Sequence, residues 1–180
     1  MQAINSHPQD IPADAQATNT SASATSETRS NCLLIRVDKL QLIVPRLLVA
    51  EVVDLEGITF TSSLNKDIKI FEWRDYQVPL VSSNVLTANG STQIQRHSKI
   101  IVFHAVLNRE KLPFYALIAS TNPRLIAVST ATITEHTNIQ NQPSTEADIL
   151  MSVIVEGEMA VIPRVQQLEK IILDSLPNRN

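Results

Sequence analysis

Short runs of β-branched and aliphatic residues occur twice in the same order along this chain, and this order constrains the fold more than any other feature. In each half, two runs joined by a short polar turn come first, followed by a single run, a second pair of runs and a helical segment. Apolar runs of this length between turn residues predict strands. We therefore expect an internally duplicated, mainly β fold of two small barrels of about five strands each, with a short helix between them and a C-terminal helix.

The predicted strands can be assigned along both halves. The polar pairs Asp38-Lys39 and Arg74-Asp75 each predict the turn of a hairpin. The first half contains predicted strands at residues 33–37, 40–44, 50–55, 68–73 and 76–81, and then a short helix that Ser83 caps and that runs to Leu86. The second half contains strands at 99–107, 113–120, 124–128, 149–155 and 159–162, and then a helix that starts at Pro163 and buries Val165, Leu168, Ile171, Ile172 and Leu176.

The composition of the chain predicts its domain boundaries. Residues 1–30 are rich in Ala, Ser, Thr, Gln and Asn and contain no aromatic residue, so they cannot bury enough apolar surface to offset the entropy of ordering. We predict a disordered tail there and a short tail at 177–180. The domain is expected to span residues 31–176, with a first barrel at about 31–90 and a second at about 96–176. A polar linker is predicted over residues 134–148.

Charge and composition narrow the classes of function. The 15 basic and 18 acidic side chains give a net charge of −3, which argues against general nucleic-acid binding. Three glycines in 180 residues exclude a glycine-rich phosphate loop, and the single cysteine, Cys32, excludes a disulfide framework. The lone thiol and the lack of a secretory signal predict a reducing cytoplasm. No apolar run approaches the roughly 20 residues of a membrane span.

Residues able to carry catalysis do not form a recognisable set. None of the four histidines has metal-ligand spacing, and Cys32 beside Leu33 is typical of a strand residue rather than of a nucleophile. Glu156 and Glu158 flank a predicted turn, where we expect a solvated hairpin tip. Aromatic residues make up only 4% of the chain, which argues against grooves that stack sugars, bases or proline-rich peptides. We predict no catalytic residue, no cofactor and no metal.

One cluster has the composition of a protein–protein contact. An arginine beside a large aromatic residue, Trp73-Arg74, stands at a predicted hairpin turn. The alternative is that Trp73 belongs to the core and that Arg74 is an exposed turn residue. Glu51 interrupts an apolar run and is either the outward side of a strand or an anchoring charge. The candidate partner-binding residues are Val49, Glu51, Val53, Trp73 and Arg74.

Three stretches, residues 43–53, 72–81 and 151–173, carry a resemblance to a known family. They are similar to the segment after the first hairpin, the Asn-Leu-Arg-Gly turn, and the final hairpin and helix of the CheW-like domain, the coupling protein of bacterial chemosensory systems. The resemblance covers residues 31–176. The fit is closer still to the ChpC type of the Pil-Chp system. Two stretches are similar to that type: Trp73-Arg74 followed by residues 78–82, and residues 113–117 leading to Pro123-Arg124. Asp75 stands where the family has the turn glycine.

The resemblance implies a fold of two SH3-like barrels related by a pseudo-twofold axis, and a scaffold without catalysis. It implies that the chain couples the cytoplasmic tip of a methyl-accepting chemoreceptor to the regulatory domain of a CheA-type histidine kinase, in control of type IV pili and twitching motility. No nucleic acid, membrane insertion or small-molecule substrate is implied. Val49 and Val53 would offer apolar contact area, Glu51 a charge that fixes register, and Arg74 a planar set of donors.

Two other classes of function stay open at this point. One is a small barrel that binds nucleic acid or peptides, which a clustered basic face would favour. The other is a barrel enzyme without a recognisable motif, which a perturbed titratable pair inside a cavity would favour.

Overall fold

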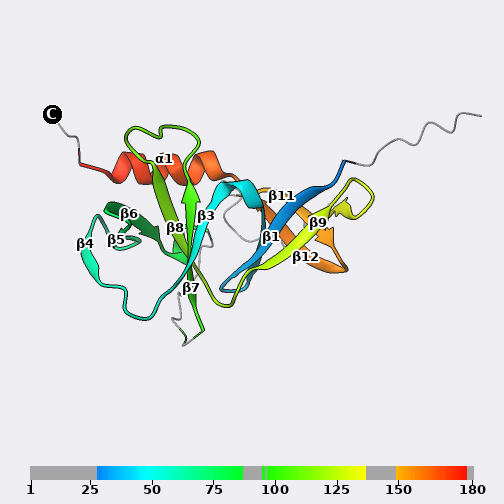
Figure 1. Ribbon diagram of the computed structural model, residues 1–180. Coiled ribbons are helices and arrows are strands. Elements are labelled where there is room, and N and C mark those ends of the chain that lie inside the picture. Colours follow the sequence, from blue (N-terminus) through cyan, green and yellow to red (C-terminus); the bar gives the residue numbers. More distant parts are fainter. Residues whose placement is uncertain (1–27, 87–94, 96, 137–148, 178–180) are drawn as a thin grey trace, which may run out of the picture.

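The computed structural model describes residues 28–86, 95, 97–136 and 149–177, which form two curled six-stranded sheets and a C-terminal helix (Figure 1). The predicted mainly β class is confirmed, although each sheet has six strands where five were expected. In spatial order, the first sheet contains β10 (Ile133–Glu135), β11 (Ile149–Val155), β12 (Glu158–Pro163), β2 (Leu40–Pro45), β1 (Ser30–Val37) and β9 (Arg124–Val128). The second contains β4 (Phe60–Ser63), β5 (Ile68–Trp73), β6 (Tyr76–Val81), β8 (Phe114–Ala119), β7 (Lys99–His104) and β3 (Val49–Asp54).

The two sheets have the same strand order and the same pairing directions. The hairpin β1–β2 stands in the first sheet where β7–β8 stands in the second, and in each sheet the second strand of the final hairpin pairs with it in parallel. The edge strands β9 and β3 also correspond, as do β10 and β4. The internal duplication read from the sequence is therefore present, in the arrangement that a pseudo-twofold relation requires.

The hairpins are exchanged between the two halves of the chain. The first hairpin, β1–β2, pairs with strands of the second half, and β7–β8 pairs with strands of the first half. The predicted division into barrels at residues 31–90 and 96–176 therefore does not match the sheets. The physical reason lies in η1 (Arg46–Leu48), a three-residue turn that leads from β2 directly into the other sheet. The apolar patterns of the strands do not show whether a hairpin pairs with strands of its own half or of the other half, because the two hairpins have equivalent patterns.

Exchange of the hairpins produces one core between the sheets and one inside each sheet. Strand β1 shows the principle, because Cys32 and Leu34 face the interior of the first sheet while Leu33 and Ile35 face the second sheet. Strands that are buried on both faces have continuous apolar runs instead of strict alternation. The shared core between the sheets consists of Leu33, Ile35, Val37, Leu42, Val44, Val49, Ile68, Val81, Leu86, Ile101, Phe103, Ala105, Leu112, Tyr115, Leu117, Ala119, Val161, Leu168 and Ile172.

The C-terminal helix α1 (Val165–Ser175) packs on this shared core. Leu168 and Ile172 are buried, as the predicted apolar face requires. The predicted start at Pro163 is wrong, because Pro163 is the last residue of β12 and pairs with Ile149. Proline is compatible with the end of a strand, where no further ladder bond is needed. No helix among the described residues is long and apolar enough to cross a membrane.

Several local predictions also need correction. The short helix after β6 is the 3-10 helix η2 (Ser83–Val85), and its N-cap is Ser82 rather than Ser83. Strands β4 and β10 were not predicted, because they are short and mostly polar; β10 takes up the start of the predicted linker. Residues 1–27 of the predicted tail, most of the linker, and residues 178–180 lie outside the described residues.

The shared core predicts that the two sheets unfold together. Ile35 is fully buried in that core, so Ile35→Ala should lower the free energy of unfolding by about 2–5 kcal/mol. Chemical denaturation followed by circular dichroism and by the single tryptophan should give one coincident transition. The control, Leu125→Ala, removes a side chain that is 61% exposed and should change stability by no more than about 0.5 kcal/mol. Two separate transitions would contradict a shared core.

Candidate functional site

Three of the predicted partner-binding residues come together at one end of the second sheet. The indole Nε1–H of Trp73 donates a hydrogen bond to Glu51 Oε2 at 2.8 Å, and Arg74 Nη2 lies 3.0 Å from the same oxygen. The guanidinium carbon of Arg74 lies 4.9 Å from the centre of the Trp73 ring, in cation–π geometry. Glu51 thus lies on β3 with its carboxylate bound to Trp73 and Arg74 of the same chain.

The hairpin turn presents Arg74 to solvent. Arg74 and Asp75 have φ of 46° and 65°, the left-handed conformation that a two-residue hairpin turn needs. Aspartate tolerates this conformation better than most residues, so Asp75 can occupy the turn without a glycine. Arginine there costs about 1 kcal/mol or more, and its contacts with Glu51 and Trp73 help to hold it. The Arg74 side chain remains 67% exposed, so its donors are accessible.

Trp73 is buried and Arg74 is exposed, as the alternative reading of this pair expected, whereas Val49 is buried where the resemblance implied exposed contact area. Trp73 is only 9% exposed, so it forms part of the core of the second sheet and supports Arg74 from below. Val49 is 4% exposed and lies in the shared core. The cause is a bulge between Val49 and Glu51, which turns Val49 to the opposite face from Glu51 and Val53. Val53 is half-buried against the core of the second sheet.

Aromatic side chains surround this cluster, and we call their location the aromatic end. The ring of Phe114 lies 5.0 Å from Trp73 and 4.9 Å from Tyr76, in edge-to-face geometry, and 5.3 Å from His104. Such pairs stabilise by about 0.5–1.5 kcal/mol beyond their burial. The low aromatic content of the sequence does not predict that Trp73, Tyr76 and Phe114 gather with His104 beside one turn. The sequence signal that could have revealed this group is that Tyr76 and Phe114 each begin a strand, and that Tyr76 directly follows the Arg74-Asp75 turn.

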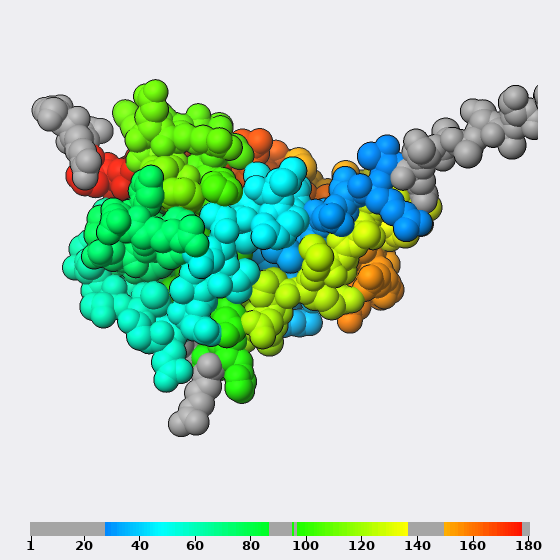
Figure 2. All heavy atoms as spheres, viewed as in Figure 1, coloured from blue at the N-terminus to red at the C-terminus, as the bar shows by residue number. Residues whose placement is uncertain are grey.

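Exposed apolar side chains lie at the same end of the second sheet. The register places η1, the Arg74-Asp75 turn and the loop of residues 105–113 there, since β3 begins opposite the end of β7 and β8 begins opposite His104. The cyan segment with η1 and β3 forms surface between the green and the blue and yellow parts in Figure 2. Large apolar side chains that stay exposed at this end are Leu47 (90%), Tyr76 (47%), Val106 (40%) and Leu107 (51%). Such a gathering is typical of a protein contact surface.

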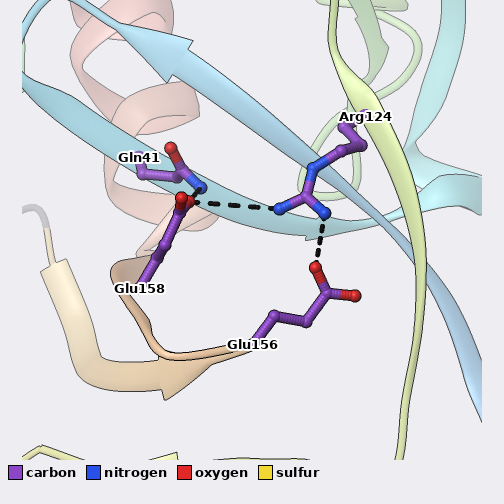
Figure 3. Close-up of polar contacts among 4 residues, drawn as sticks. All are labelled: Gln41, Arg124, Glu156 and Glu158. Atoms are coloured by element: carbon purple, nitrogen blue, oxygen red, sulfur yellow. Dashed lines mark hydrogen bonds and ion pairs between the residues drawn. The ribbon is translucent and has the colours of Figure 1, made fainter.

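A second polar cluster lies at one end of the first sheet (Figure 3). Arg124 from β9 forms ion pairs with Glu156 and Glu158, at the turn between β11 and β12, and Gln41 Nε2 donates a hydrogen bond to Glu158 at 2.9 Å. The two glutamates lie at an exposed hairpin tip, as predicted, and each is also paired with Arg124. They border an open hollow of about 440 Å³ whose lining also includes Arg36. The ion pairs join β9 to the β11–β12 hairpin, which is not next to β9 in the sheet, and so they help to hold the first sheet in its curled shape.

Among the described residues, two groups have shifted pKa values, and both are buried in the core. Burial raises the pKa of the Cys32 thiol, which disfavours the thiolate and agrees with a structural strand residue. Burial also raises the pKa of Tyr115 above its usual range, and the nearby Glu169 carboxylate raises it further. Among the residues that the structure describes, no three His, Cys, Asp or Glu side chains form a group that could hold a metal ion.

The hydrogen bond from Trp73 to Glu51 predicts a spectroscopic signature. Glu51→Ala leaves the indole N–H without its acceptor and Arg74 without its ion pair. Trp73 is the only tryptophan, so its emission should shift to longer wavelength, and stability should fall by about 1 kcal/mol. Glu72→Ala, at an exposed glutamate on β5 next to Trp73, is the matched control and should change neither quantity. Unchanged emission in Glu51→Ala would show that this contact does not persist in solution.

Comparisons with known proteins identify the fold. No family model matches the sequence, and no curated protein matches it. Among solved structures, the scaffolding protein TtCheW from Thermoanaerobacter tengcongensis is similar, with a TM-score of 0.60, 14% sequence identity, and coverage of 76% of this chain and 90% of TtCheW. The predicted CheW-like fold, with its two SH3-like units, is therefore confirmed. At this identity the likeness concerns the fold alone.

Proposed function

We propose that this protein is a non-catalytic adaptor that couples a methyl-accepting chemoreceptor to a CheA-type histidine kinase in a chemotaxis-type signalling system. The observation that carries the proposal is the convergence of Glu51, Trp73 and Arg74 at one exposed end of the fold. The CheW-like fold supports it, because a solved structure with that fold is a scaffolding protein. The protein would act in the cytoplasm, where the receptor tip and the kinase lie.

The contact surface would combine one exposed cation with apolar area. Arg74 would offer its planar donors to a carboxylate or carbonyl of the partner, while Glu51 keeps the guanidinium in place. Tyr76 and Leu47 would supply apolar contact area around Arg74, the combination that is typical of a binding hot spot. Val53 borders the site, whereas Val49 would act only through packing beneath β3.

Coupling in this scheme consists of holding two partners in fixed geometry. A receptor tip and a kinase regulatory domain held on the same rigid molecule share one set of conformational states, so a small shift in one biases the other. The shared core makes this molecule suitable, because the two sheets cannot move apart without exposing it. No step in this scheme requires a cofactor or a chemical reaction.

We further propose that the signalling system is a Pil-Chp type that controls type IV pili and twitching motility. The support is the sequence resemblance of Trp73-Arg74, of residues 78–82 and of residues 113–117 to the ChpC type. Deletion of the gene should then impair twitching on surfaces and leave swimming by flagella unchanged. The reverse result would assign the adaptor to another chemosensory system.

Capture of purified partners tests the adaptor function. Arg74→Ala and Glu51→Lys should each weaken binding of the receptor tip or of the kinase regulatory domain by about 1–2 kcal/mol, or roughly 5- to 30-fold. Lys66→Ala, which removes an exposed cation from a turn elsewhere in the second sheet, is the matched control and should bind as the unmodified protein does. Equal capture of both partners by all variants would remove Arg74 and Glu51 from the interface. Failure of the unmodified protein to bind either partner would refute the adaptor function.

A further inference from the structure

Glu169 on α1 is the one charged residue among the described parts of the chain that is buried, with 0% exposure. A buried carboxylate costs several kcal/mol unless it is paired or hydrogen-bonded. The salt bridges between described residues do not include Glu169. Its oxygens instead accept hydrogen bonds from two successive backbone amides: that of Val106 at 2.9 and 3.0 Å, and that of Leu107 at 2.7 Å.

These bonds fix the start of the loop between β7 and β8, which lies beside α1 (Figure 1). The loop has further internal contacts, because Arg109 donates to the carbonyl of Ala105 at 2.8 Å and Leu112 is buried in the shared core. Val106 and Leu107 nevertheless keep their side chains 40% and 51% exposed. The carboxylate holds the two amides against α1 while the two apolar side chains remain partly exposed to solvent.

The same loop leads into the aromatic end. Its base is closed by a hydrogen bond from the Ala105 amide to the Pro113 carbonyl at 3.1 Å, and the next residue is Phe114. The Phe114 ring contacts both Trp73 and Tyr76, which flank the turn that carries Arg74. A continuous set of contacts therefore runs from Glu169 to the exposed arginine.

We propose that Glu169 is a positioning residue for the candidate partner site: it anchors the loop of residues 105–113, so that Val106 and Leu107 are presented beside the aromatic end and Phe114 supports Trp73 and Arg74. This inference deepens the proposed adaptor function and rests on it. It also gives α1 a role beyond covering the shared core, because the helix holds the partner surface by a charge rather than by packing alone. The partner would present apolar side chains to Val106 and Leu107 and an acidic group to Arg74.

The test compares Glu169→Gln with Ile172→Val by three measurements. The glutamine keeps the shape of the side chain but has only one oxygen to accept from two amides. We expect the Val106 and Leu107 amides to exchange with solvent at least about tenfold faster, the equivalent of about 1.4 kcal/mol. Acrylamide quenching of Trp73 fluorescence should increase, and binding of the purified receptor tip or kinase regulatory domain should fall about tenfold. Ile172→Val, on the same helix, reduces packing in the shared core and should change none of these.

The outcomes separate positioning from a merely structural role. If Glu169→Gln lowers stability but leaves Trp73 quenching and amide exchange as in Ile172→Val, the proposal is overturned. If the unmodified protein binds neither partner, the adaptor function fails, while quenching and exchange still decide whether Glu169 positions the site. Glu169→Asp keeps both carboxylate oxygens on a shorter side chain. It should change amide exchange, Trp73 quenching and partner binding in the same direction as Glu169→Gln, but by a smaller amount. This variant decides the question if Glu169→Gln does not fold.

Discussion

The core that lies between the two sheets is the constraint on which the rest of this structure depends. It forms because the hairpins β1–β2 and β7–β8 change places between the halves of the chain, so that their strands are buried on both faces. With its centre filled in this way, the molecule is left with edge strands, hairpin tips and loops as surfaces for function. The candidate site uses all three: the edge strand β3, the turn after β5 and the loop after β7.

The two sheets use similar contacts with reversed charges. In the second sheet, the hairpin tip supplies Arg74 and the edge strand supplies Glu51; in the first, the tip supplies Glu156 and the edge strand supplies Arg124. Both tip residues adopt the left-handed conformation, with φ of 46° and 51°. Both ion pairs are exposed and contribute little stability alone. The difference that favours the second sheet as the partner site is the group of aromatic rings beneath Arg74.

Local features were predictable from the sequence, and non-local ones were not. The turn at Arg74-Asp75 and the strands on either side follow from alternation and turn residues, and they are confirmed. The burial of Val49 does not follow from the sequence, because the bulge that turns this residue inward has no signature in a run of aliphatic residues. Glu169 was overlooked because it adjoins the apolar face of α1 and its partners are backbone amides, which no side-chain pattern reveals. Exchange of the hairpins was not predictable either, because it depends on which strands pair and not on the pattern within any one strand.

We propose that one rigid molecule holds a receptor and a kinase together. Sedimentation of the protein mixed with a purified chemoreceptor tip and the kinase regulatory domain tests this claim most directly. We expect one complex that contains all three components, formed at concentrations where receptor tip and kinase domain alone do not associate. Only two-component complexes, in which receptor tip and kinase domain displace each other from the protein, would contradict it.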